Sequence, residues 1–131
     1  MHAAVAAAIP FTLIPAYATE FELNHIMKTV SPSCLFVQPD LLPKALKAAS
    51  TGGLTSNRVY VLEGTSPGRQ SLGDLIKTVV SRKIPQEPVR TVTKDTIAYF
   101  IFSSGTSSLP KGLCEIYLAS SISRLNSFGQ L

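Results

Sequence analysis

Residues 97–112 read Ile97-Ala98-Tyr99-Phe100-Ile101-Phe102-Ser103-Ser104-Gly105-Thr106-Ser107-Ser108-Leu109-Pro110-Lys111-Gly112. The apolar, β-prone start of this stretch predicts a strand over residues 97–102. Small hydroxyl residues and glycines follow, and they let the backbone approach a ligand closely. Free N–H groups, hydroxyls and the Lys111 ammonium can all donate to anionic oxygens. The stretch therefore predicts a strand that leads into a phosphate-binding loop.

The preceding part of the chain alternates predicted strands and helices. Apolar or β-branched runs predict strands over 11–14, 34–37 and 59–62, and an alanine-rich piece predicts a helix over 3–8. Helices with one apolar face are predicted after Thr19, after Pro39 and after Ser71. Residues 113–118 are a further possible strand, and residues 119–128 a possible short helix. This alternation predicts an α/β fold with a mostly parallel sheet.

Two of the predicted helices begin with a capping box. Thr19 is followed three residues later by Glu22, and Ser71 by Asp74, the spacing at which side chain and backbone satisfy each other's free groups. The apolar stripe of the last helix consists of Leu72, Leu75, Ile76, Val79 and Val80. Because a parallel sheet that lacks neighbouring strands leaves edges and apolar faces exposed, we expect the chain alone to aggregate.

Charge is distributed unevenly along the chain. The net charge is +4, and residues 67–131 hold eight basic and four acidic residues, whereas residues 1–66 hold four of each. The excess suits an anionic ligand. No basic stripe interleaves with aromatic residues, so we expect no nucleic-acid partner. No apolar run is long enough to span a bilayer.

The remaining single residues indicate an intracellular protein. Cys34 and Cys114 form neither a metal-binding spacing nor a disulfide framework, and Cys34 reads as a small buried hydrophobe. His25 lies off the apolar stripe of its helix and is expected to be solvated. The apolar N-terminus lacks the basic residues of a signal peptide, so a cytoplasmic or peroxisomal location is expected.

The loop does not match the common nucleotide and nucleophile motifs. It lacks the G-x-x-x-x-G-K-[ST] spacing of a P-loop, the G-x-S-x-G of a nucleophile elbow and the G-x-G-x-x-G of a dinucleotide site. From its chemistry alone, a turn without a ligand and a phosphate seat both remain open.

Residues 101–112 resemble the phosphate-loop signature of the adenylate-forming enzymes. This superfamily includes acyl-CoA synthetases, 4-coumarate–CoA ligases, luciferases and peptide-synthetase adenylation domains. Upstream, residues 3–8, Ile14-Pro15-Ala16-Tyr17, the helix after Thr19 and residues 38–42 resemble the 4-coumarate–CoA ligase branch. The resemblance covers about residues 3–112 and implies a fragment of the large N-terminal domain.

The resemblance implies a function and a set of binding residues. These enzymes join a carboxylic acid to ATP, release pyrophosphate, and pass the acyl group to a thiol. The resemblance implies ATP and Mg²⁺ as cofactors, coenzyme A as co-substrate, and nucleotide and carboxylic acid as binding partners. The implied phosphate-binding residues are Ser103, Ser104, Gly105, Thr106, Ser107, Ser108, Lys111 and Gly112. No catalytic or metal-ligating residue is assigned.

The sequence departs from the family pattern in the loop and after it. Ser108 stands where the family has a second glycine, and no histidine follows Gly112. We therefore expect residues 1–112 to be a partial adenylation domain and residues 113–131 a divergent tail, without activity alone. Two alternatives are a non-catalytic module that binds ATP or pyrophosphate, and a small secreted or structural α/β protein.

Overall fold

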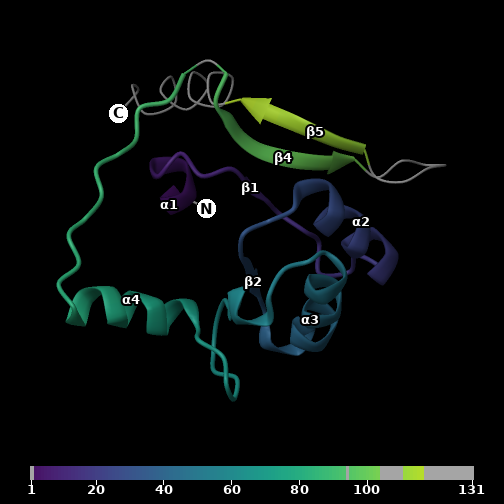
Figure 1. The fold of residues 1–131 in the computed structure, drawn as a ribbon, viewed down its shortest axis with the longest axis horizontal. Coiled ribbons are helices and arrows are strands. Elements are labelled where there is room, and N and C mark those ends of the chain that lie inside the picture. The colour runs from purple at the N-terminus through teal and green to yellow at the C-terminus, as the bar shows by residue number, and fades with distance from the viewer. Residues whose placement is uncertain (1, 94, 104–110, 117–131) are drawn as a thin grey trace, which may run out of the picture. The chain divides into compact units, whose positions relative to one another are not determined.

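The computed structural model describes residues 2–93, 95–103 and 111–116. The chain divides into two compact units, Met1–Leu13 with Gln86–Leu131 (unit 1), and Ile14–Pro85 (unit 2). Each unit has its own hydrogen-bonded strands (Figure 1). The predicted fragment 1–112 thus contains all of unit 2 and most of unit 1.

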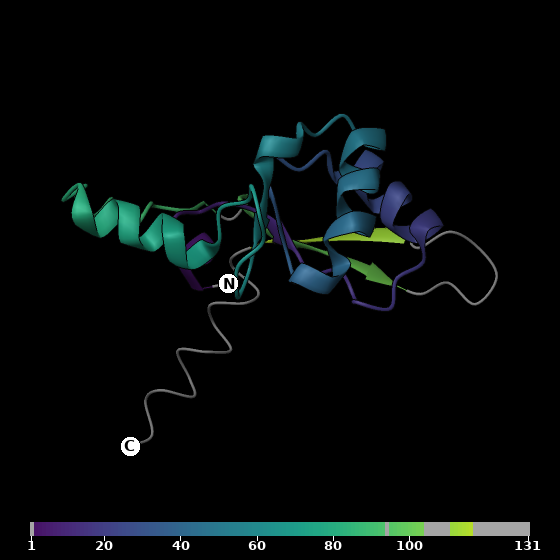
Figure 2. The same ribbon diagram turned by 90° about the horizontal axis from the view of Figure 1, so that it is seen from below.

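Unit 1 is built on a three-stranded sheet. It contains the short helix α1 (His2–Ala6) and the strands β1 (Phe11–Thr12), β4 (Ile97–Ser103) and β5 (Lys111–Ile116). The strand order is β1-β4-β5, so β4 is central. The β1–β4 pair is parallel, with Phe11 opposite Tyr99. The β4–β5 pair is antiparallel (Figure 1), and these two strands, green and yellow, also lie side by side in Figure 2. Strand β1 covers only Phe11–Thr12 and is shorter than the strand predicted over residues 11–14.

Unit 2 contains a parallel strand pair and three helices. Its elements are α2 (Glu20–Val30), β2 (Leu35–Val37), α3 (Leu42–Thr51), β3 (Val59–Val61) and α4 (Leu72–Ser81), with 3₁₀ turns at Pro39–Leu41 and Ser56–Arg58. Leu35, Phe36 and Val37 lie opposite Val59, Tyr60 and Val61 in register. Parallel pairing of β2 with β3, and of β1 with β4, confirms the predicted strand arrangement.

Both predicted capping boxes are present. The Thr19 N–H donates to Glu22 Oε2 at 2.7 Å, and the Glu22 N–H donates back to Thr19 Oγ1 at 3.2 Å. At α4, the Ser71 N–H donates to Asp74 Oδ2 at 2.9 Å, and the Asp74 N–H donates to Ser71 Oγ at 3.1 Å. Each box satisfies donors that the first helical turn leaves free.

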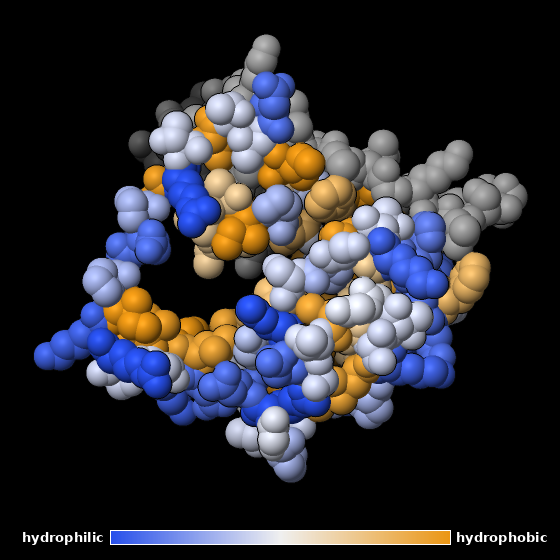
Figure 3. Space-filling model, in the orientation of Figure 1, coloured by the Kyte–Doolittle hydropathy of each residue, from blue (hydrophilic) through white to orange (hydrophobic). Residues whose placement is uncertain are grey.

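Helix α4 carries the predicted apolar stripe, and the stripe is not buried. Among its ten described residues none is buried, and Val80 is 69% exposed. Figure 3 shows apolar side chains gathered along this helix.

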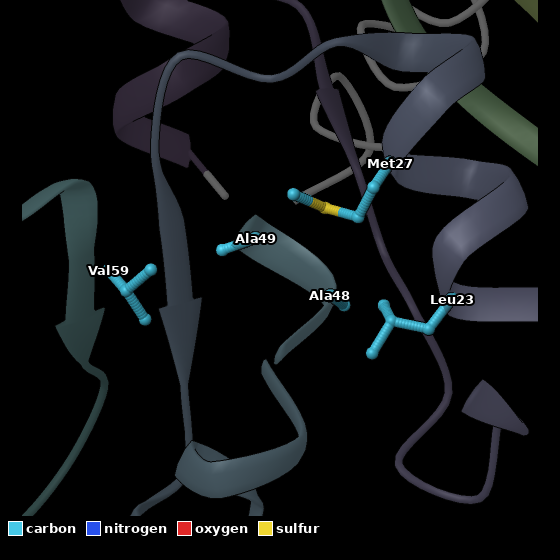
Figure 4. Packing of buried hydrophobic residues seen from close by; sticks show 5 residues of the cluster. All are labelled: Leu23, Met27, Ala48, Ala49 and Val59. Atoms are coloured by element: carbon cyan, nitrogen blue, oxygen red, sulfur yellow. The ribbon is translucent and has the colours of Figure 1, made fainter. Parts of the chain in front are cut away.

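The core of unit 2 lies where α2, α3 and β3 meet. It consists of Leu23, Met27, Ala48, Ala49 and Val59, which Figure 4 shows pointing toward one another. The two α3 residues are alanines, so the helix axes can approach closely. A Cβ added at Gly52 would lie 2.9 Å from Met27 Cβ, which shows how tightly the end of α3 meets α2.

Two single-residue expectations were wrong. Cys34 is a free, exposed thiol rather than a buried hydrophobe, because it precedes β2 and lies outside the strand pair. His25 is half-buried rather than solvated.

Candidate functional site

The candidate site is the hairpin formed by β4, residues 104–110 and β5. The run Ile97–Phe102 consists of apolar, mostly β-branched or aromatic residues, which favour a strand with neighbours on both sides. Ala98 is 1% exposed, so the middle of unit 1 excludes water at β4. The predicted phosphate loop therefore begins on the central strand of its sheet.

Strand β1 holds β4 from the other side. The Thr12 hydroxyl donates to the Phe100 carbonyl at 2.9 Å, and Thr12 lies opposite Phe100 in register. One step earlier, the rings of Phe11 and Tyr99 lie 5.8 Å apart between centroids. The hydrogen bond from Thr12 to Phe100 joins residues 88 positions apart in sequence, so no local sequence pattern would have indicated it.

The register of β4 and β5 fixes both ends of the loop. Ser103 lies opposite Lys111, and Phe102 lies opposite Gly112. In an antiparallel ladder, opposed Cα atoms are about 4.5–5.5 Å apart. The pairing thus places Ser103, the last residue before positions 104–110, across from Lys111, the first residue after them.

The structure corrects the predicted position of three site residues. Ser103 is the last residue of β4, and Lys111 and Gly112 are the first two of β5, so the paired strands extend further than the sequence indicated. Each of the three residues is paired in the antiparallel register of β4 and β5. The other predicted residues, Ser104, Gly105, Thr106, Ser107 and Ser108, lie outside the described residues.

Strand β5 also departs from the expected parallel arrangement. It begins at Lys111, two residues before the predicted strand at 113, and runs antiparallel to β4. A connection as short as residues 104–110 can join antiparallel neighbours, whereas a parallel neighbour requires a crossover of a dozen residues or more. The hairpin is the physical consequence of that short connection.

Within the described residues, nothing else forms a comparable site. No group of three or more His, Cys, Asp or Glu side chains in residues 2–93, 95–103 and 111–116 is arranged to hold a metal ion. A hollow of about 150 Å³ in unit 2 is lined by Asn57, Val59, Tyr60, Gly68, Arg69 and Gln70. Its one charged residue, Arg69, already donates to the Ser56 carbonyl.

Other features bear on the class of protein. No helix in the described part of the chain is long and apolar enough to cross a membrane. Among the side chains that the structure describes, three carboxyl groups have a lowered pKa, and all three belong to unit 2. The hydrogen bond from Lys47 lowers the pKa of Glu20, and the bonds from Thr19 and Ser71 lower those of Glu22 and Asp74. They support the scaffold rather than the loop.

The fold is shared with two solved structures. The anthranilate CoA ligase AuaEII, solved in complex with anthranoyl-AMP, superposes with a TM-score of 0.68 at 22% identity, over 82% of this chain and 20% of that chain. A luciferase-like enzyme from the nonluminescent mealworm Zophobas morio gives a TM-score of 0.57 at 22% identity, over 76% of this chain and 23% of that chain. This chain therefore spans about a fifth of the length of either relative.

Among curated proteins, none matches this chain. The comparison with protein-family models, however, supports the same relationship. The family model described as AMP-binding enzyme matches residues 1–115, which include all of unit 2 and the part of unit 1 up to Glu115 in β5. The resemblance and the α/β fold class predicted from sequence are thereby confirmed, and the chain belongs to the AMP-binding enzyme family.

Proposed function

We propose that this chain is part of an ATP-dependent carboxylic acid–CoA ligase, and that residues 103–112 bind the β- and γ-phosphates of ATP. The observation that carries the proposal is the register that pairs Ser103 with Lys111 across the base of a loop rich in Ser, Thr and Gly. Lysine supplies a point charge, and backbone N–H groups and hydroxyls supply directed donors. Family membership makes ATP the natural source of those phosphates.

Each proposed contact has a plausible strength. A hydrogen bond between an ionised partner and a phosphate oxygen contributes about 1.5–3 kcal/mol. Ser108 would add a Cβ where related loops have glycine, so we expect it to weaken the site. The branch close to 4-coumarate–CoA ligases remains part of the proposal, because residues 14–17 and 38–42 carry that likeness.

Magnesium and coenzyme A would come with the substrates. The described residues hold no cluster that fits a protein-bound metal, so we propose that Mg²⁺ arrives on the ATP phosphates, as magnesium commonly does. Coenzyme A would be the acceptor of the acyl group in the longer enzyme. The free thiol of Cys34 suits a reducing compartment, which supports a cytoplasmic or peroxisomal location.

We also propose that this chain does not complete the reaction alone. Adenylation needs groups that converge from several elements on the reacting atoms, and this chain spans about a fifth of the length of a CoA ligase with the same fold. In that case the loop would bind ATP or pyrophosphate without catalysing a reaction, and this non-catalytic binding is the second candidate function.

Isothermal titration with ATP–Mg²⁺ tests the binding proposal. We expect Lys111→Ala to weaken binding by about tenfold or more, since it removes a charge-assisted contact. Lys28→Ala, which removes the same charge from an exposed position in α2, is the matched control and should leave binding unchanged. Equal affinity of the Lys111→Ala and unaltered proteins would refute the assignment of the loop.

Pyrophosphate exchange separates the two candidate functions. The unaltered chain is incubated with ATP, an aryl or fatty acid and labelled pyrophosphate. Binding without entry of label into ATP is expected. Label that enters ATP in an acid-dependent way would show that the chain forms an acyl-adenylate by itself.

A further inference from the structure

Strand β1 is short, so its hold on β4 depends on few contacts. It contributes two residues, Phe11 and Thr12, to a parallel pairing in which Thr12 lies opposite Phe100. Thr12 adds a side-chain contact to this ladder, because its hydroxyl donates to the Phe100 carbonyl at 2.9 Å in a partly buried position. Since only two residue pairs form the ladder, a hydrogen bond to one specific carbonyl does much to fix the register of β1 against β4.

On its other side, the same residue of β4 pairs with β5. Phe100 lies opposite Cys114, so Thr12, Phe100 and Cys114 form one row across the sheet of unit 1. Beyond this row the ladder of β4 and β5 is regular as far as Ser103 and Lys111, the two residues at the base of the predicted phosphate loop. Three strand residues span about 10 Å. A short, regular stretch of ladder therefore links the row of Thr12 to the base of the loop.

The ladder of β4 and β5 is irregular on the side of this row that faces away from the loop. Its register shifts between Ile97 and Tyr99, as at a β-bulge. Bulges bend a strand and interrupt its pairing, and they occur often beside functional sites. Strand β1 pairs with β4 at Tyr99 and Phe100, immediately beyond the shift. The Thr12 hydrogen bond therefore holds β4 where its regular ladder toward the loop begins.

We propose that Thr12 is a positioning residue for the phosphate loop. Its bond to the Phe100 carbonyl holds β4 against β1, and this fixes the position of Ser103 and Lys111, between which the loop runs. The inference rests on the function proposed above for residues 103–112. Threonine suits this place for two reasons: its β-branched side chain favours a strand, and its hydroxyl supplies the donor that valine, of similar shape, lacks.

Titration of the full chain with ATP–Mg²⁺ compares Thr12→Val, which removes the donor, with Thr12→Ser, which keeps it. We expect Thr12→Val to weaken binding by about two- to tenfold, the range for loss of one hydrogen bond, and Thr12→Ser to bind nearly as the original protein does. Thr78→Val is the matched control, because it removes a 2.8 Å hydroxyl bond to the Asp74 carbonyl in unit 2, and it should leave the affinity unchanged. Unaltered affinity in Thr12→Val, or an equal loss in Thr12→Ser or Thr78→Val, would overturn the proposal.

Two further measurements separate positioning from stability and from the proposed function. Urea unfolding defines conditions in which each variant is fully folded, and a Thr12→Val protein that is less stable but binds ATP–Mg²⁺ normally there has lost only a structural contact, which would overturn the proposal. Amide hydrogen exchange without ATP examines the hairpin itself. Thr12→Val should exchange several-fold faster at residues 101–103 and 111–113, and at the original rate in α2. If the original protein binds no ATP–Mg²⁺, the proposed function fails, whereas unchanged exchange at these residues overturns positioning by Thr12 whether or not ATP binds.

Discussion

Gly52 shows how a single hydrogen atom sets the distance between two helices. Gly52 caps the C-terminal end of α3 with φ −86°, a backbone conformation that any residue can adopt. What excludes a larger residue is space, because an added Cβ would lie only 2.9 Å from Met27 Cβ. The side chain of Met27 is fully buried and cannot move away freely. Gly52 is needed here for space rather than for backbone freedom.

Gly52→Ala is therefore expected to destabilise unit 2 by about 1–3 kcal/mol, the usual cost of overpacking. Gly73→Ala is the matched control: it lies inside α4, where an added Cβ meets only Ser71 Oγ at 3.6 Å. That variant should gain about 0.5–1 kcal/mol from helix propensity. Urea denaturation of the two variants measures both, and a Gly52→Ala protein as stable as the original would contradict the tight contact.

Met27 is the central side chain of the core of unit 2. It is 0% exposed and contacts the alanines of α3, so truncation leaves a cavity. We expect Met27→Ala to lower the free energy of unfolding by about 2–5 kcal/mol. Met27→Leu, which nearly conserves volume, should cost less than about 1.5 kcal/mol. Thermal or urea unfolding that ranks the two equally would argue against this packing.

At the scale of elements, the capping boxes give α2 and α4 a dependence on pH. The backbone N–H of Thr19, and then its hydroxyl, lower the pKa of Glu22, and the backbone N–H and hydroxyl of Ser71 do the same for Asp74. A lowered pKa in the folded state means that the carboxylates stabilise the helices above their ordinary pKa values. That stabilisation is lost as the pH falls through the lowered values.

Helicity should accordingly fall as the pH drops below about 4, the ordinary range of these carboxyl groups. Glu22→Gln and Asp74→Asn should be less helical at neutral pH and should show a smaller change on acidification. Far-ultraviolet circular dichroism across this range measures the effect. If the original protein and the variant that carries both substitutions show the same acid transition, the capping boxes do not contribute to helix stability.

The sequence predicted the elements whose signals are local. The Thr19–Glu22 and Ser71–Asp74 spacings located the starts of α2 and α4, because a capping box is decided by residues within one turn. It misplaced Lys111 and Gly112, because the end of a strand depends on pairing with a neighbour rather than on the strand's own residues. Cys34 was misjudged for the same reason, since burial at a strand end depends on what lies beside it.

The same limit applies to the candidate site. The motif in residues 101–112 indicated which residues to examine, and the family match over residues 1–115 confirms the resemblance. The bond from Thr12 to Phe100 and the opposition of Ser103 and Lys111 are long-range or pairing features. Only a structure supplies them.

At the scale of the whole molecule, charge bears on the proposed function. The excess of basic residues over acidic ones lies entirely in residues 67–131, the half that carries the loop. A cationic half attracts a polyanion through water, and salt screens that attraction over about 8 Å at physiological ionic strength. The proposed ATP site should therefore be sensitive to salt.

The affinity for ATP–Mg²⁺ is expected to fall several-fold between low and high salt, whereas the affinity for uncharged adenosine should stay the same. Titration calorimetry at two ionic strengths compares the ligands. An affinity for ATP that does not change with salt would mean that Lys111 and its basic neighbours in the sequence do not attract the phosphates.

The central claim is that residues 103–112 receive the phosphates of ATP. Backbone amide signals in a nitrogen-15 NMR titration with ATP–Mg²⁺ test it most directly. We predict that the signals of Ser103 through Gly112, Pro110 excepted, shift on addition of ATP, and that Lys111→Ala suppresses those shifts. Shifts confined to residues 14–85, or the absence of any shift between Ser103 and Gly112 at saturating ATP, would contradict the account.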